Sequence, residues 1–175
     1  MWSKKSEGCR PDLYGEEPKV PKISIMIWGC ITSNGVGTLY MTEENINAVH
    51  YLNILDENLW PVMLKEFPAG DGVFQQDNAS VHTAHIIRDF MREGNIKMLP
   101  CPVKSPDLNI IKNLWFMLKF DIKSNIERIN NFSDLKTIIR ECWNGISKSY
   151  VRTLYNSIPR RLRAVQISKG HLTKY

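Results

Sequence analysis

The chain has 175 residues, of which 43% are hydrophobic and 23% charged, and its formal net charge is +5. These values predict one folded domain and exclude a largely disordered chain. No apolar run reaches the roughly 18 residues of a membrane span, and the first residues lack the apolar block of a signal peptide. We therefore expect a soluble, intracellular protein with no membrane partner. The four cysteines are widely spaced and predict neither a zinc site nor a disulfide framework.

The first predicted elements form a β-hairpin. Apolar and polar residues alternate over residues 22–32, which is the pattern of a half-buried strand. The sequence SNGVG at 33–37 predicts a turn, and residues 38–42 return as a second strand. From Ile46 to Lys65, apolar residues at helical spacing predict a helix, namely Val49, Leu52, Leu55, Leu59 and Met63.

Strands and helices alternate after this first helix. The segment GVFQQDN at 72–78 predicts a short strand, and Ser80 predicts the cap of the helix that follows. A further strand is expected at 96–100. Apolar residues three and four positions apart predict two later helices, one across 108–122 and one that begins at Ser133. This order of elements predicts an α/β domain with a mixed sheet flanked by helices.

Two polar motifs interrupt the apolar patterns. They are VFQQDNASVHTAH at 73–85 and SPDLNIIKNLW at 105–115. One helix–strand crossover separates the strand that leads to Asp77 from the helix of the second motif. Such a crossover brings the two segments together at the edge of the sheet where α/β proteins bind ligands. The motifs therefore predict a single functional site.

These motifs resemble those of the catalytic domain of Tc1/mariner-type transposases, where they read roughly FQQDNAPxH and SPDLNPIENLW. The resemblance extends to IMIWGCITSNGVG at 25–37, YLNILDENLWP at 51–61 and the ending PRR…SKGHLTKY, so it covers almost the whole chain. It implies an RNase H-like fold and metal-dependent DNA cleavage and strand transfer. In that family three carboxylates hold two divalent ions, normally Mg²⁺, which clamp the attacking and leaving oxygens of a phosphoryl displacement.

By this resemblance Asp77 matches the second carboxylate, whereas Lys112 stands where the family has its third, a glutamate. The spacing between the two positions is that of the family, so the lysine is a substitution and not a shift of register. The first carboxylate would lie on a strand upstream of Trp2. We therefore expect the first strand of the RNase H-like sheet to be missing, together with its acid.

A lysine at position 112 opposes metal binding. A unit positive charge about 4 Å from Mg²⁺ is repelled by roughly 8 kcal/mol at an effective dielectric constant of about 20. We therefore predict that Mg²⁺ is not bound productively and that the chain is catalytically inactive. We further hypothesise that Lys112 pairs with Asp77, with its amino group within about 4 Å of the carboxylate. The alternative is a degenerate surface position.

Four further motif residues complete the expected site. Asn78 and His82 match the family motif around Asp77, and His82 is expected to hydrogen-bond near that carboxylate. Asp107 is expected to cap the helix of the second motif, with Asn109 nearby. A metal-ligand role for Asp107 is the weaker alternative.

The positive charge of the chain lies at its C-terminal end. Between Pro159 and Tyr175, five basic residues and no acidic residue account for the whole net charge, namely Arg160, Arg161, Arg163, Lys169 and Lys174. A basic segment suits a polyanion, so we predict that these residues contact nucleic-acid phosphates without sequence preference. A solubilising tail is the alternative.

The resemblance completes the functional expectations. It implies DNA as the partner, a nuclear location and a homodimer, with no small-molecule substrate. We predict a truncated RNase H-like core at 1–127 and a C-terminal helical extension with the basic tail at 128–175. Three functions stay open: an active transposase, a non-catalytic nucleic-acid-binding remnant or regulator, and a folded relic without a role.

Overall fold

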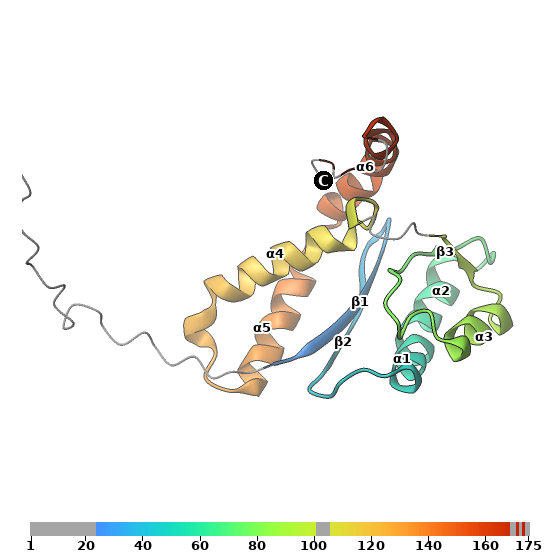
Figure 1. Ribbon diagram of the computed structural model, residues 1–175. Helices are drawn as coiled ribbons and strands as arrows, with labels where there is room; N and C mark the ends of the chain where they lie inside the picture. The colour runs from blue at the N-terminus through green and yellow to red at the C-terminus, as the bar shows by residue number, and fades with distance from the viewer. Residues whose placement is uncertain (1–23, 101–105, 169–170, 172, 174–175) are drawn as a thin grey trace, which may run out of the picture.

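The computed structural model describes residues 24–100, 106–168, 171 and 173 (Figure 1). Its strands are β1 (Met26–Thr32), β2 (Gly35–Thr42), β3 (Val73–Phe74) and β4 (Lys97–Met98). Its α-helices are α1 (Ala48–Ile54), α2 (Trp60–Glu66), α3 (His85–Glu93), α4 (Ile111–Ser124), α5 (Phe132–Asn144) and α6 (Lys148–Ile167). A π-helix, η2 (Leu55–Leu59), joins α1 to α2, and the 3₁₀ helices η3 (Pro106–Leu108) and η4 (Ile126–Arg128) flank α4. In these described residues no helix is long and apolar enough to cross a membrane.

The hairpin forms as the alternating pattern predicts. Strands β1 and β2 pair antiparallel from Met26 opposite Thr42 to Thr32 opposite Gly35, so the turn is the two residues between them. Gly35 has a φ of 132°, a conformation that a side chain would strain. The register shifts between Gly29 and Ile31. Such a bulge increases the local twist of the hairpin.

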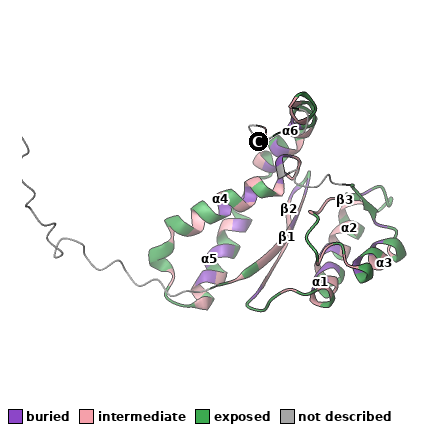
Figure 2. Cartoon of the chain, viewed as in Figure 1, coloured by how far each residue is buried: buried purple, intermediate pink, exposed green. Residues whose placement is uncertain are grey.

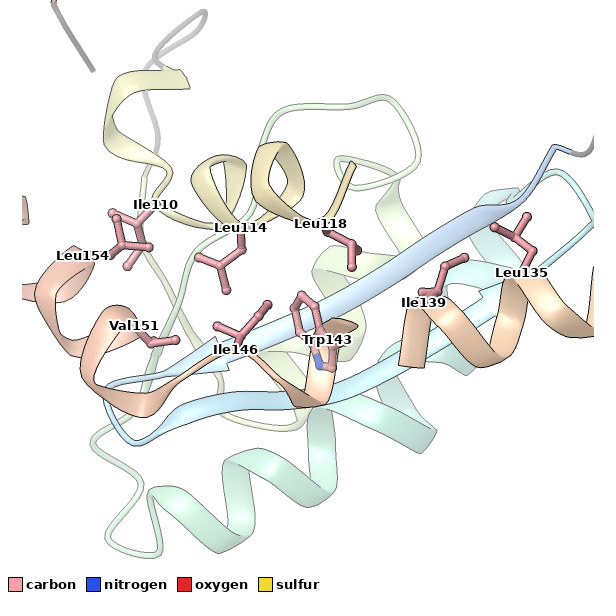
Figure 3. Packing of buried hydrophobic residues seen from close by; sticks show 9 residues of the cluster. All are labelled: Ile110, Leu114, Leu118, Leu135, Ile139, Trp143, Ile146, Val151 and Leu154. Atoms are coloured by element: carbon pink, nitrogen blue, oxygen red, sulfur yellow. The ribbon is translucent and has the colours of Figure 1, made fainter. Parts of the chain in front are cut away.

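Two apolar cores lie against the hairpin. The first contains buried residues of α4, α5 and α6 packed against Ile27 and Ile31 of β1. Figure 3 shows its side chains, from Ile110 to Leu154, pointing toward one another beside the hairpin. The second contains buried residues of α1, η2 and α3, with Trp28 of β1 against them. Figure 2 shows the buried residues of these helices on their inner sides. The hairpin therefore separates two layers of helices.

The described residues form two separate two-stranded sheets in place of the single mixed sheet that the sequence predicts. Strands β1 and β2 are antiparallel, whereas β3 and β4 are parallel. A cavity of about 660 Å³ is lined by every residue of β1 and by residues 73–77 at β3. Most of its lining is apolar, with Asp77, His82 and Lys112 among the polar exceptions. The space between the two strand pairs is therefore a groove that leads to the predicted site.

Local chemistry moved several predicted boundaries. The helix expected from Ser80 begins at His85, with Ala84 as its N-cap residue. The carbonyl of Ala79 accepts the amides of His82 and Thr83, which folds this segment into turns before the helix begins. The later helix begins at Phe132, one residue earlier than predicted. Its cap is Asn131, whose side chain accepts the amide of Asp134.

The helix predicted from Ile46 to Lys65 is present as three consecutive pieces, α1, η2 and α2. The π-turn of η2 comes just before Pro61, which lies in the first turn of α2 and has no amide hydrogen to donate. Val49, predicted to face inward, is 60% exposed. Tyr51 and Ile54 instead fill the core beside Leu55 and Leu59.

Candidate functional site

The two motifs meet at one ion pair. Asp77 follows β3, and Lys112 is the second residue of α4. The Lys112 Nζ atom lies 2.9 Å from Asp77 Oδ2, which is the separation that the pairing hypothesis requires. Both side chains are close to half exposed, at 47% and 44%. The pair therefore lies at the mouth of the groove, in contact with both the interior and the solvent.

Contacts between the two motif segments hold this pair together. Gln75 Nε2 donates to the carbonyl of Leu108 at 3.2 Å, which ties the segment after β3 to η3. The amide of Lys112 donates to the carbonyl of Asn109 at 3.1 Å in the turn that starts α4. Asp77 and Lys112 thus come from segments that the backbone already places side by side.

His82 holds the other oxygen of the carboxylate. Its Nδ1 atom lies 2.8 Å from Asp77 Oδ1, although the residue is in a turn and not on a helix with His85. The imidazole packs on the ring of Tyr51, with 4.4 Å between centroids. Tyr51 donates its hydroxyl hydrogen to Gln76 Oε1 at 2.6 Å, and Gln76 Nε2 donates to the carbonyl of His82 at 3.2 Å.

Tyr51 and Gln76 were missed by reasoning from the sequence. A signal for Gln76 was present, because two consecutive amides precede the acid in FQQDN. Tyr51 gave no comparable signal, since it lies between predicted inward positions of a helix and touches the site only through the fold. Burial raises the pKa of Tyr51, so its hydroxyl stays neutral and remains a hydrogen-bond donor to Gln76.

The carboxylate of Asp77 is charged in this setting. Partial burial raises its pKa, but the hydrogen bond and positive charge of Lys112, followed by the charge of His82, outweigh that effect. The net result is a pKa of Asp77 below its usual value. Electrostatic balance at the site is therefore provided by side chains of the protein itself.

The described side chains around Asp77 do not supply the ligands that a pair of divalent ions needs. Mg²⁺ prefers several hard oxygen ligands, and a two-ion site needs carboxylates from more than one residue. In residues 24–100 and 106–168, no group of three or more His, Cys, Asp or Glu side chains could hold a metal ion. Both oxygens of the Asp77 carboxylate are already in contact with cationic or imidazole nitrogens. This donor set is that of an ion pair.

Asp107 does not have the capping role predicted for it. It is 7% exposed, and α4 begins at Ile111 with Ile110 as an N-cap residue that makes no side-chain capping hydrogen bond. Its Oδ2 atom accepts the amide and the hydroxyl of Thr173, at 3.1 and 2.7 Å. Asp107 therefore anchors Thr173. Asn109 lies beside it in the turn before α4, and Asn78 is exposed next to Asp77.

The predicted nucleic-acid-binding residues divide by exposure. Arg160 and Arg163 are exposed on α6. Arg161 is only 3% exposed, and its guanidinium donates to Ser157 Oγ, to the carbonyl of Asp107 and to Asn113 Oδ1 at 2.8–3.0 Å. A phosphate contact for Arg161 is therefore wrong, because its donors face the interior. Lys169 and Lys174 lie outside the described residues.

Comparison with known proteins gives close sequence relatives. Residues 1–136 match the DDE superfamily endonuclease family. The Tc1 transposase of Caenorhabditis elegans is 31% identical over 179 residues, covering 99% of this chain and 63% of that protein. The Tcb1 transposase of Caenorhabditis briggsae is 30% identical, covering 100% of this chain and 64% of that protein. The chain thus spans less than two thirds of the length of these relatives.

Solved structures share the fold. The catalytic domain of Mos1 mariner transposase has a TM-score of 0.73 at 21% identity, covering 86% of this chain and 76% of that one. The Mos1 mariner paired end complex with Mn has a TM-score of 0.76 at 21% identity, covering 98% of this chain and 52% of that one. These likenesses confirm the predicted RNase H-like α/β fold. The relatives and solved structures that it resembles are Tc1 and mariner transposases, and the chain itself belongs to the DDE superfamily endonucleases.

Proposed function

We propose that this chain is a non-catalytic DDE domain that keeps the nucleic-acid partner of its family but has lost metal-dependent DNA cleavage and strand transfer. The observation that carries the proposal is the 2.9 Å contact between Lys112 Nζ and Asp77 Oδ2. In an active domain this acid would share metal ions with a glutamate at the lysine position. Here an ammonium group neutralises it.

The argument against metal is one of competition for a single carboxylate. Solved structures of the Mos1 catalytic domain are described with Mn and with Mg. An ion entering this site would have to displace Lys112 from Asp77 and remain close to its positive charge. That charge opposes the ion both before and after the exchange, because α4 fixes the lysine backbone beside the acid. We infer that productive binding of Mg²⁺ is lost.

DNA is the proposed partner. A solved Mos1 transposase complex is described as containing a left transposon end. In this chain, the net charge of +5 and the exposed Arg160 and Arg163 support phosphate contacts that do not depend on sequence. We propose that these contacts serve a DNA-binding remnant or regulator in the nucleus, and that the chain acts as a homodimer.

A metal-binding and cleavage experiment tests the proposal. Mn²⁺ is titrated into the wild-type chain and into Asp77→Asn, Lys112→Glu and the double variant Asp77→Asn/Lys112→Glu. Electron paramagnetic resonance measures the concentration of free Mn²⁺. Lys112→Glu should bind Mn²⁺ about tenfold more tightly than wild type, because it removes a repelling charge and adds a ligand. The double variant should lose this gain.

Lys119→Glu is the matched control, because Lys119 is an exposed lysine of the same helix in no ion pair with Asp77. It should leave Mn²⁺ binding unchanged. In parallel, wild-type chain is incubated with duplex DNA and Mg²⁺ or Mn²⁺, and no cleavage is expected. Metal-dependent cleavage that Asp77→Asn abolishes would overturn the proposal.

A further inference from the structure

Helix α4 exposes two phenylalanines that belong to neither apolar core. Phe116 is 76% exposed and Phe120 is 65% exposed. They are one helical turn apart, on the side away from the buried Leu114 and Leu118. Exposed aromatic side chains that adjoin one another commonly mark a binding surface, whereas single exposed apolar residues are unremarkable.

Three lysines share this surface with the two rings. Lys112, Lys119 and Lys123 are exposed on the same helix. At about 100° per residue, these lysines and the two phenylalanines fall within an arc of about 100° around the helix axis. Figure 2 shows α4 exposed on the side away from α5. We call this set of five residues the α4 outer face.

Two of the three lysines of the α4 outer face have no balancing acid, whereas Lys112 is paired with Asp77. Asp121 is the one acidic residue of α4, and at about 100° per residue it lies opposite Lys112 around the axis. Among the described residues, neither Lys119 nor Lys123 lies within ion-pair distance of a carboxylate. The face thus offers aromatic rings flanked by cations, which is the combination that binds nucleic-acid strands.

The spacing of the rings favours a single strand over a duplex. Four residues of α-helix rise about 6 Å, so Phe116 and Phe120 are offset by more than the roughly 3.4 Å between stacked bases of a duplex strand. Bases that have left the stack can each pack on one ring. A protein partner fits less well, because lysines are depleted at protein–protein interfaces and three of them line this face.

We propose that the α4 outer face binds single-stranded DNA, with bases stacked on Phe116 and Phe120 and phosphates contacted by Lys119 and Lys123. The strand would run along α4 toward Lys112 and the Asp77 site. This inference rests on the proposed DNA partner and adds to it which surface is used and which form of DNA. It is independent of whether the Asp77 site binds metal.

Anisotropy of a short fluorescein-labelled oligothymidine, titrated with the full chain, tests the stacking. Phe116→Ala/Phe120→Ala should weaken binding by about tenfold or more, because base–aromatic stacking is lost. Phe116→Leu/Phe120→Leu should lose nearly as much, since leucine keeps the apolar area but has no ring face. Val49→Ala/Leu64→Ala changes two apolar residues that are 60% and 57% exposed on other helices, and should leave binding unchanged. Circular dichroism checks that every variant is folded.

The salt dependence of the same titration tests the lysines. Lys119→Gln/Lys123→Gln should reduce the slope of log affinity against log salt by about 1.4, the value for two phosphates of a single strand. Labelled duplex DNA should show a much smaller effect of the phenylalanine variants, because its bases stay stacked. Loss of single-strand binding with duplex binding retained is the result that supports the proposal.

The outcomes separate this inference from the proposed function. If all the phenylalanine and lysine variants bind DNA as tightly as wild type, the α4 outer face is not the binding surface. DNA would then remain the proposed partner. Leucine variants that bind as wild type would also overturn this inference, since the contact would then be apolar and not stacking. A dimer in sedimentation that the alanine variant abolishes would assign the face to a second copy. Wild-type chain that binds no DNA of either form would contradict both proposals.

Discussion

Asp77 shows how the fold joins the two motifs through one ion pair. The polar residues around it keep the order of the family, and the fold brings position 112 to its carboxylate. A glutamate at 112 would add a second negative charge that needs a cation. A lysine supplies that cation from the chain itself. The result is a carboxylate whose two oxygens are both in contact with side chains of the chain itself.

The energy of the ion pair should be small and should depend on pH. Lys112→Gln is expected to lower the free energy of unfolding at pH 7 by at most about 1 kcal/mol, because both partners are close to half exposed. The pKa of Asp77 is lowered in the folded chain, so its stabilising effect is present above the ordinary carboxyl pKa of about 4 and is lost as the pH falls through the lowered value.

Urea unfolding of wild type and Lys112→Gln between pH 7 and pH 2 measures this dependence. The difference between the two should be constant down to about pH 5 and should disappear toward pH 2. Lys65→Gln changes an exposed lysine away from the site and serves as the control. A difference that grows on acidification would contradict the assigned pairing.

Sequence reasoning succeeded at this residue scale where local pattern determines the outcome. The approach of Lys112 to Asp77 could be predicted, because the crossover between the motifs fixes where their segments lie. The hydrogen bond between Tyr51 and Gln76 could not, because it joins residues 25 positions apart through side-chain geometry. Asp107 was misassigned for the same reason, since its partner Thr173 is 66 positions away.

At the scale of elements, α6 packs against the second motif and holds it in place. Its buried residues Val151, Leu154, Ser157 and Arg161 recur every three or four positions, which is the spacing of one helix face. This spacing was visible in the sequence, but the run of basic residues suggested a surface role for Arg161. Periodicity would have been the better guide than charge at that position. The structure places Arg161 against Asp107 and Asn113 at the start of α4.

Removing the hydrogen bonds of Arg161 should destabilise the fold. Arg161→Leu is expected to lower the free energy of unfolding by about 3 kcal/mol. The reason is that it leaves the carbonyl oxygen of Asp107 and the side-chain oxygen Oδ1 of Asn113 without their buried hydrogen-bond donor. Arg163→Leu, which changes an exposed arginine of the same helix, should stay within about 0.5 kcal/mol. Urea denaturation of both variants measures the difference. Equal effects would mean that the buried hydrogen bonds contribute little.

The first core depends on Trp143 of α5. This residue is 1% exposed, stacks on Trp115 at 5.2 Å between centroids, and donates from Nε1 to the carbonyl of Gly37 at 3.0 Å. Trp143→Ala should lower the free energy of unfolding by about 3–5 kcal/mol, because it opens a large cavity and removes that hydrogen bond. Phe116→Ala, on the exposed side of α4, is the control and should change stability little. Thermal unfolding followed by circular dichroism distinguishes the two.

At the scale of the whole molecule, the groove between the two strand pairs is the feature that sequence patterns predicted least well. Each strand could be recognised from its own residues. Whether β1 and β3 pair with each other depends on long-range geometry, and β3 and β4 join through only two residues each. In the described residues, β1 is hydrogen-bonded to β2 alone, and its other side faces the groove. An unpaired strand edge beside apolar residues favours association with another polypeptide segment or with a ligand.

The groove should therefore bind an apolar probe while the chain is native. Anilinonaphthalene sulfonate is expected to increase its emission with wild-type chain under conditions where near-ultraviolet circular dichroism shows fixed tertiary packing, because the 660 Å³ cavity offers an apolar lining. Met26→Arg places a charge on a groove-lining residue that is 43% exposed, and should weaken dye binding several-fold. Leu64→Arg is the matched control, since Leu64 is 57% exposed and does not line the groove. If Met26→Arg and Leu64→Arg bind the dye equally well, the dye binds outside the groove. The groove would then be closed in solution by the packing of β1 against β3.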